Sequence, residues 1–103
     1  YAQPSVTKVG GITEFLKIIS LCEEKNIKLM PHSPYFCPGF LATLQLSRCM
    51  KDLSLLERFF VKPEAYLYPK NIFNPKNALF SPPKGFGLGV EPNKDVIKSY
   101  KVN

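Results

Sequence analysis

The sequence predicts an α/β fold in which short strands alternate with amphipathic helices. Apolar residues recur at helical spacing over residues 12–25, and a second apolar run at residues 39–50 favours another helix. Candidate strands lie around these helices, in the segments YAQP, IKLM and SLLERFF. The order strand, helix, strand, helix, strand is the repeated crossover pattern of a parallel sheet.

The first helix is predicted from its apolar stripe, which is interrupted by Glu and Lys residues. Gly10 and Gly11 mark the turn into it, and Asn26 stands where a helix commonly ends. The stripe consists of Ile12, Phe15, Leu16, Ile19 and Cys22. The following segment, IKLM, is too short for a helix before Pro31 and is therefore a strand candidate.

The third strand candidate carries a carboxylate among apolar residues. In SLLERFF, Leu55, Glu57 and Phe59 alternate with Leu56, Arg58 and Phe60. Burying the Glu57 carboxylate without a partner would cost several kcal/mol. Glu57 therefore needs either a catalytic task or a structural pair with a neighbouring lysine or arginine.

The chain divides at about residue 60. Residues 1–60 hold the alternating pattern, whereas residues 61–103 are rich in proline and exclude long helices until NKDVIKSY, where Asn93 is a candidate N-cap. The segment GFGLG follows Pro-Pro-Lys rather than a strand and predicts a tight turn, not a phosphate cradle. This second part must pack on another part of the protein, because it carries too many aromatic side chains to leave in water. They are Tyr66, Tyr68, Phe73, Phe80 and Phe86.

Charge, apolar content and cysteine spacing limit the classes of partner that the protein is expected to bind. The formal charge is +6, but the twelve lysines and two arginines are scattered, which is typical of a solvated surface rather than a nucleic-acid site. No apolar stretch approaches the roughly 18–20 residues of a membrane helix. Three cysteines without a CxxC motif argue against a disulfide framework or a zinc site. We expect a cytoplasmic protein without nucleic-acid or membrane partners.

His32, the single histidine, directly follows Pro31 at the end of IKLM. Functional side chains of parallel sheets come from the carboxyl ends of strands, so its position favours catalysis. The alternative is a histidine that only completes a turn.

Four segments together carry a family resemblance: QPSVTKVGGITEFLKI, KLMPHSPY, LLERFF and GLGVEPNKDVI. In this order they resemble the C-terminal part of the mandelate racemase and muconate lactonizing group of the enolase superfamily. The resemblance implies that residues 1–60 are strands six to eight of a modified (β/α) TIM-type barrel with their helices. It implies that residues 61–103 return to pack on the barrel and on a capping domain. We therefore expect the chain to be a C-terminal fragment of a longer protein.

The resemblance implies an enzyme that abstracts the proton α to a carboxylate, with Mg²⁺ stabilising the enediolate. His32 matches the histidine that acts as general base or acid. Glu57 matches the glutamate that hydrogen-bonds the substrate carboxylate, a role that requires a protonated carboxyl group. The Mg²⁺ ligands are expected on strands three to five, before Tyr1, so no residue of this chain is assigned to the metal.

Ser5 departs from the family pattern. The resemblance implies at this position either an aspartate that partners the histidine or a basic lysine. Ser5 is therefore a candidate partner of His32, at less electrostatic benefit than a carboxylate, unless the carboxylate comes from another strand. Lys8, Ser33 and Tyr35 are candidate substrate-binding residues.

A sugar-acid dehydratase, a lyase acting on a 2,3-dihydroxy acid, is the first hypothesis. Racemisation or epimerisation of a 2-hydroxy acid is the second hypothesis. It needs two competent bases, and the serine at position 5 in place of an aspartate weakens one of them. The parent protein is expected to be a homo-oligomer, and the 103-residue chain alone to be inactive. If the chain is complete, the rival hypothesis is a non-catalytic binding or structural module.

Overall fold

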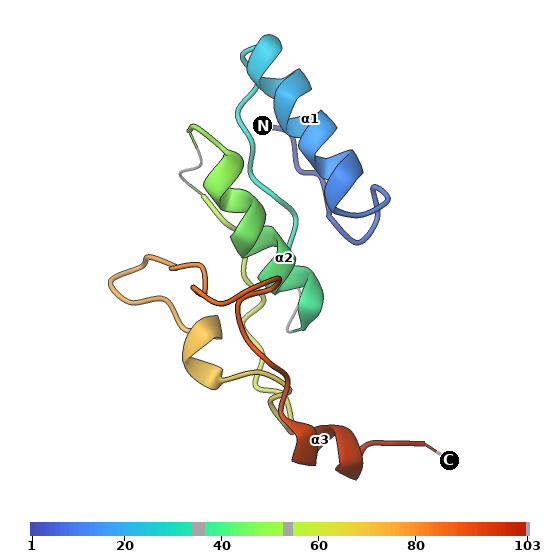
Figure 1. Ribbon diagram of the computed structural model, residues 1–103. Coiled ribbons are helices and arrows are strands. Elements are labelled where there is room, and N and C mark those ends of the chain that lie inside the picture. Colours follow the sequence, from blue (N-terminus) through green and yellow to red (C-terminus); the bar gives the residue numbers. More distant parts are fainter. Residues whose placement is uncertain (34–36, 53–54, 103) are drawn as a thin grey trace.

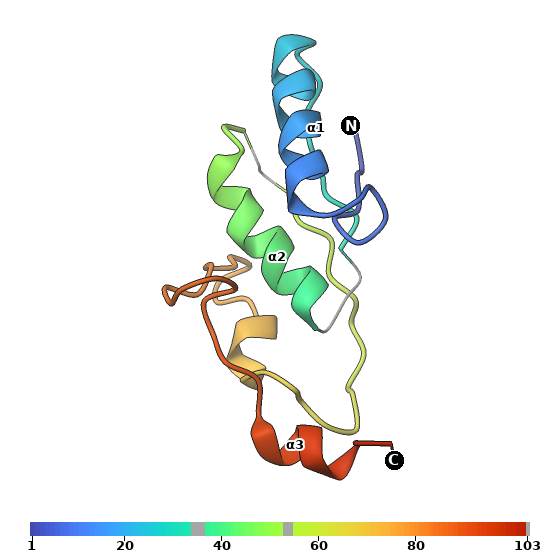
Figure 2. The same ribbon diagram turned by 45° about the vertical axis from the view of Figure 1, so that its right-hand side comes forward.

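The computed structural model describes residues 1–33, 37–52 and 55–102. Helix α1 (Ile12–Glu24) and helix α2 (Pro38–Leu46) lie side by side and run in the same direction (Figures 1 and 2). The predicted helix at 12–25 is confirmed to within one residue. The predicted helix at 39–50 begins one residue earlier, at a proline that suits the first helical position. It continues after α2 as the 3₁₀ helix η1 (Ser47–Cys49).

Helix α1 buries only part of its predicted apolar stripe. Phe15, Ile19 and Cys22 are buried, whereas Ile12 and Leu16 are 49% and 40% exposed. The helix follows Gly11, whose φ of 94° lies in a region that favours glycine. It is followed by Asn26, at a φ of 53°. The predicted turn residues thus bound the helix at both ends.

The first two strand candidates pair in parallel, but only briefly. Ala2 N donates to Lys28 O at 2.8 Å, Met30 N donates to Ala2 O at 3.0 Å, and His32 N donates to Pro4 O at 3.0 Å. Between the second and third of these bonds, a regular parallel ladder would have a bond donated by the N–H of residue 4. Residue 4 is a proline, which has no N–H. The pairing is therefore reduced to one parallel bridge, between Ala2 and Leu29.

The expectation of three regular strands is wrong for the described residues. Only isolated bridges occur among them, and residues 55–60 continue as irregular backbone beside the 28–33 segment (Figure 2). The chain order of the α/β prediction is retained, with helices after the first and second extended segments. Residues 53 and 54 of the third strand candidate lie outside the described part of the chain.

Helix α2 is buried on almost every side because it lies between two apolar clusters. One cluster joins it to α1 and to Leu29, and includes Phe15, Ile19 and Leu46. The other joins it to the C-terminal segment. Its buried members are Phe40, Leu41, Leu44, Tyr68 and Phe73. A helix that is apolar all round belongs in the interior of a fold, which explains its sequence, PGFLATLQL.

The C-terminal segment packs on α2 through aromatic side chains, as predicted, except that Phe86 is fully exposed. The Phe40 ring lies 5.6 Å from that of Phe73 and 5.3 Å from that of Phe80, between ring centroids. The segment contains the 3₁₀ helix η2 (Lys70–Phe73). No helix in the described ranges is long and apolar enough to span a membrane.

Two local predictions for this segment are confirmed. Helix α3 (Lys94–Ser99) is capped by the Asn93 side chain, which accepts hydrogen bonds from Asp95 N and Val96 N. GFGLG forms a tight turn in which Gly89 N donates to Phe86 O at 2.9 Å. Gln45 of α2 holds this turn by donating to Pro83 O and Leu88 O.

Candidate active site at His32 and Glu57

His32 lies at the carboxyl end of the 28–32 segment. Its backbone N–H donates to Pro4 O at 3.0 Å, so the main chain at His32 is fixed to the first segment. Pro31 on one side and Ser33 on the other are buried, which limits the movement of the backbone. The His32 side chain itself is 37% exposed and is therefore accessible.

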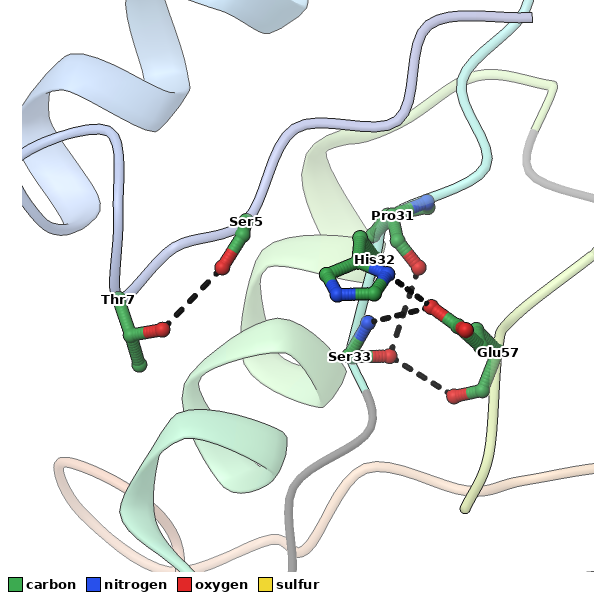
Figure 3. Close-up of polar contacts among 6 residues, drawn as sticks. All are labelled: Ser5, Thr7, Pro31, His32, Ser33 and Glu57. Carbon is green, nitrogen blue, oxygen red and sulfur yellow. Dashed lines mark hydrogen bonds and ion pairs between the residues drawn. The ribbon is translucent and has the colours of Figure 1, made fainter.

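Glu57 faces His32 across the two segments. The His32 Nδ1 atom lies 2.7 Å from Glu57 Oε2, and the Glu57 side chain is 36% exposed (Figure 3). This distance is that of a charge-assisted hydrogen bond. Glu57 is thus only partly buried, contrary to the expectation, and its carboxylate is paired with the histidine rather than with a lysine or arginine among the described residues.

Ser33 joins the same two segments. Its backbone N–H donates to Glu57 Oε2 at 3.2 Å, and its hydroxyl donates to the Glu57 carbonyl oxygen at 2.8 Å (Figure 3). The hydroxyl also contacts Pro31 O at 3.5 Å, and the residue is fully buried. Ser33, chosen from the sequence as a candidate substrate-binding residue, thus contacts both the main chain and the carboxylate of Glu57.

The other predicted residues lie on the first segment or outside the description. Ser5 is buried next to Pro4, and its hydroxyl shares a hydrogen bond of 3.1 Å with Thr7 Oγ1 (Figure 3). Lys8 is exposed in the turn that follows, where its backbone N–H donates to Ser5 O. Tyr35 falls outside the described residues.

The contact between the His32 and Glu57 side chains is not predicted from the sequence. His32 and Glu57 were each selected for their own position, and no spacing in the sequence signals that their side chains meet. The hydrogen bonds from Ser33 to Glu57 are not predicted from the sequence either, because a serine next to a histidine is not informative by itself. Only the pairing of distant segments brings the three residues together.

The described residues do not provide a metal site. They contain no group of three or more His, Cys, Asp or Glu side chains able to hold an ion. A cavity of about 400 Å³ lies elsewhere, lined by the end of α1 and by residues 26–29 and 50–52. This is the amino end of the 28–32 segment, opposite to His32, and functional groups of parallel α/β folds gather at the other end.

The family of the chain follows from comparison with known proteins. Residues 1–96 match the model of the enolase C-terminal domain-like family. This match covers nearly the whole chain, so the chain belongs to that family. The resemblance inferred from the four sequence segments is thereby confirmed, and with it an origin in the enolase superfamily, whose fold is related to the α/β TIM barrel.

Three curated relatives give the family context. The chain is 33% identical to o-succinylbenzoate synthase of Bacillus subtilis (strain 168), over 91% of this chain and 26% of the relative. It is 28% identical to D-gluconate dehydratase of Thermoproteus tenax, over 96% and 20% respectively. It is 29% identical to D-galactonate dehydratase of Pectobacterium atrosepticum, over 92% and 27%. The chain thus spans about a quarter of the length of these relatives, all of which are enzymes.

Proposed function

We propose that the chain is the C-terminal part of an enolase-superfamily enzyme that abstracts the proton α to a carboxylate, and that it dehydrates a sugar acid. The observation that carries this proposal is the 2.7 Å contact between His32 Nδ1 and Glu57 Oε2. It joins the two residues that the family resemblance assigns to catalysis. Relatives named as D-gluconate and D-galactonate dehydratases support the sugar-acid substrate class.

In this proposal residues 1–60 correspond to barrel strands six to eight, and residues 61–103 to the segment that returns to the capping domain. The short parallel pairing of the first two segments and the packing of the C-terminal segment on α2 support this division. The exposed side chains of Leu55, Phe59 and Phe60 would then face neighbouring parts of the whole enzyme. Mg²⁺ is the cofactor implied by the family, with ligands outside these residues.

The proposed reaction assigns the leaving-group proton to His32. A base elsewhere in the whole enzyme takes the C2 proton of a 2,3-dihydroxy acid, and the electron pair expels the hydroxyl group at C3. His32, as imidazolium, protonates this departing hydroxide so that water leaves. The resulting enol takes up a solvent proton at C3 and becomes a 2-keto-3-deoxy acid.

Glu57 lies beside this histidine and is proposed to contact the substrate carboxylate. Its Oε2 atom is engaged by His32 and Ser33. Oε1 has no hydrogen-bond partner in the part of the chain that the structure describes, so it is the oxygen available to substrate. This role requires that Oε1 carry a proton when substrate is bound. Oε1–H would then donate to the developing enediolate and lower the barrier, because negative charge grows there in the transition state. Lys8 follows the first segment and is proposed near the same substrate. Ser5 is the second proposed partner of His32.

Racemisation or epimerisation of a 2-hydroxy acid is a second candidate. It requires a histidine basic enough to exchange a proton with the α-carbon, and the Glu57 carboxylate gives His32 an anionic partner despite the serine at position 5. In that case His32 would return a proton to C2 and no water would be lost.

The test is a substrate panel with the whole protein and Mg²⁺. Sugar acids, including D-gluconate and D-galactonate, and 2-hydroxy acids without a 3-hydroxyl group are incubated and assayed for 2-keto acids. The proposal predicts a keto acid from at least one 2,3-dihydroxy acid. Inversion at C2 without any keto acid would support the second candidate and overturn dehydration.

A further inference from the structure

We infer that Glu57 is the positioning residue of His32, held in place by Ser33, so that the orientation of the histidine is set from the 55–60 segment. The catalytic consequence of this role rests on the proposed function. The contacts among His32, Ser33 and Glu57 do not depend on it. Positioning is an added role for Glu57, which the family resemblance ties only to the substrate carboxylate.

Two consecutive residues direct hydrogen bonds to the same oxygen. Ser33 N lies 3.2 Å and His32 Nδ1 lies 2.7 Å from Glu57 Oε2. A backbone N–H can only donate, so the group at the Oε2 position must accept. In the protein without substrate we take Glu57 as an ionised carboxylate, which can only accept. His32 then donates to it through Nδ1–H, and the neutral ring is held in the tautomer that leaves Nε2 unprotonated.

Ser33 also anchors the backbone that carries Glu57. Its fully buried hydroxyl donates to Glu57 O at 2.8 Å, which ties the 55–60 segment to the 28–33 segment at this residue. Main chain and carboxylate are thus both held by one serine. Because residues 55–60 have irregular backbone, the position of the Glu57 carboxylate would not be fixed without these hydrogen bonds.

The arrangement leaves the ring accessible while fixing its orientation. The His32 and Glu57 side chains are 37% and 36% exposed, and Figure 3 shows the second ring nitrogen on the side away from Glu57. A carboxylate accepts a hydrogen bond from the ring with its full charge, whereas the neutral hydroxyl of Ser5 would offer only a dipole. Glu57, whose Oε2 lies 2.7 Å from Nδ1, is therefore the residue expected to set the ring orientation.

The test reads the tautomer of His32 by ¹⁵N NMR of the whole protein without substrate, labelled at histidine. The His32 signals are those absent from the spectrum of His32→Asn. At a pH where the ring is neutral, we expect the proton on Nδ1. Glu57→Ala should shift the population toward the Nε2–H form, whereas Glu57→Gln should retain Nδ1–H, because Ser33 N selects the amide oxygen.

Ser5→Ala and Glu24→Gln serve as comparisons, the latter at an exposed carboxylate that pairs with Lys25. Both should leave the tautomer as in the parent protein. The inference is overturned if Glu57→Ala keeps the Nδ1–H tautomer, or if Ser5→Ala changes it more than Glu57→Ala does. Circular dichroism of each variant confirms that the comparison is between folded proteins.

Kinetics then separate this inference from the proposed function. If His32 acts in dehydration, Glu57→Ala lowers kcat by about 10–100-fold, the usual range for a group that orients a catalytic ligand or base. Glu57→Gln recovers part of that loss. A tautomer that depends on Glu57 in a protein without dehydratase activity supports the positioning role and contradicts only the proposed function.

Discussion

The Nδ1 atom of His32 lies 2.7 Å from Glu57 Oε2, and the neighbouring Ser33 is bonded to the same glutamate through both its backbone and its hydroxyl. One short stretch of chain thus supplies the histidine and the group that holds its partner. The stability and the chemistry of this region are therefore expected to respond to the same substitutions.

Replacing Ser33 by alanine should destabilise the protein. The substitution removes the hydroxyl that donates to Glu57 O and leaves a partly buried carbonyl without that donor. A loss of about 1–3 kcal/mol in the free energy of unfolding is expected, measured by urea denaturation. Ser20→Ala is the matched control, because Ser20 bonds Leu16 O at an exposed position. Equal stability of the two variants would contradict the anchoring role.

Phe40 is expected to be central to the packing of the C-terminal segment on α2. It is 1% exposed and contacts the rings of Phe73 and Phe80. Phe40→Ala should cost about 3–5 kcal/mol, from lost burial and the cavity left behind. Phe86→Ala removes a fully exposed ring and should change the free energy of unfolding by less than about 0.5 kcal/mol. A similar effect at both positions would show that the packing is not as described.

Gly89 should tolerate no side chain. Its φ is +87°, and an added Cβ would lie 2.6 Å from Pro83 Cβ and 2.7 Å from Gln45 Nε2. Gly89→Ala is expected to displace the turn from α2 and lower the thermal unfolding midpoint. Gly87, at a φ of +59°, has no neighbour within 4 Å of a Cβ. Gly87→Ala therefore reports the backbone cost alone, and an equally large drop there would remove the steric explanation.

Tyr68 should make stability depend on alkaline pH. Burial raises the pKa of its hydroxyl above the ordinary 10.0, with Cys37 and Glu91 adding unfavourable negative charge. The unfolded chain therefore releases this proton at lower pH than the folded protein. The stabilising contribution is complete below about pH 10 and is lost as the pH rises through the folded-state pKa.

Tyr68→Phe removes this titration. The free energy of unfolding of the variant, measured by denaturation at several pH values above 9, should fall less steeply with pH than that of the parent protein. Identical slopes would mean that Tyr68 is not the group responsible.

Local signals in the sequence were sufficient for the helices and turns. The apolar stripe of α1, Asn93 before α3 and the glycines of GFGLG each act within a few residues, and each was predicted correctly. The strands were overestimated because Pro4 removes an N–H from the ladder, a consequence that appears only once the pairing register is known.

The site was predictable as a set of residues but not as an arrangement. His32 and Glu57 stood out by their positions, one after a strand candidate and one as an acid among apolar residues. Their contact depends on the register between two segments 24 residues apart, measured from Ser33 to Glu57, which no local pattern encodes. The same holds for the Ser33 hydroxyl, whose acceptor lies on the other segment.

The most direct test of the proposed dehydration follows the α-proton in D₂O with the whole protein, Mg²⁺ and a sugar acid that it consumes. Dehydration with His32 as the acid predicts a 2-keto-3-deoxy product with one solvent-derived deuterium at C3. His32→Asn should lower its rate of formation by about 10²–10⁴-fold. Deuterium appearing at C2 of the recovered substrate, without loss of water, would contradict the proposed dehydration.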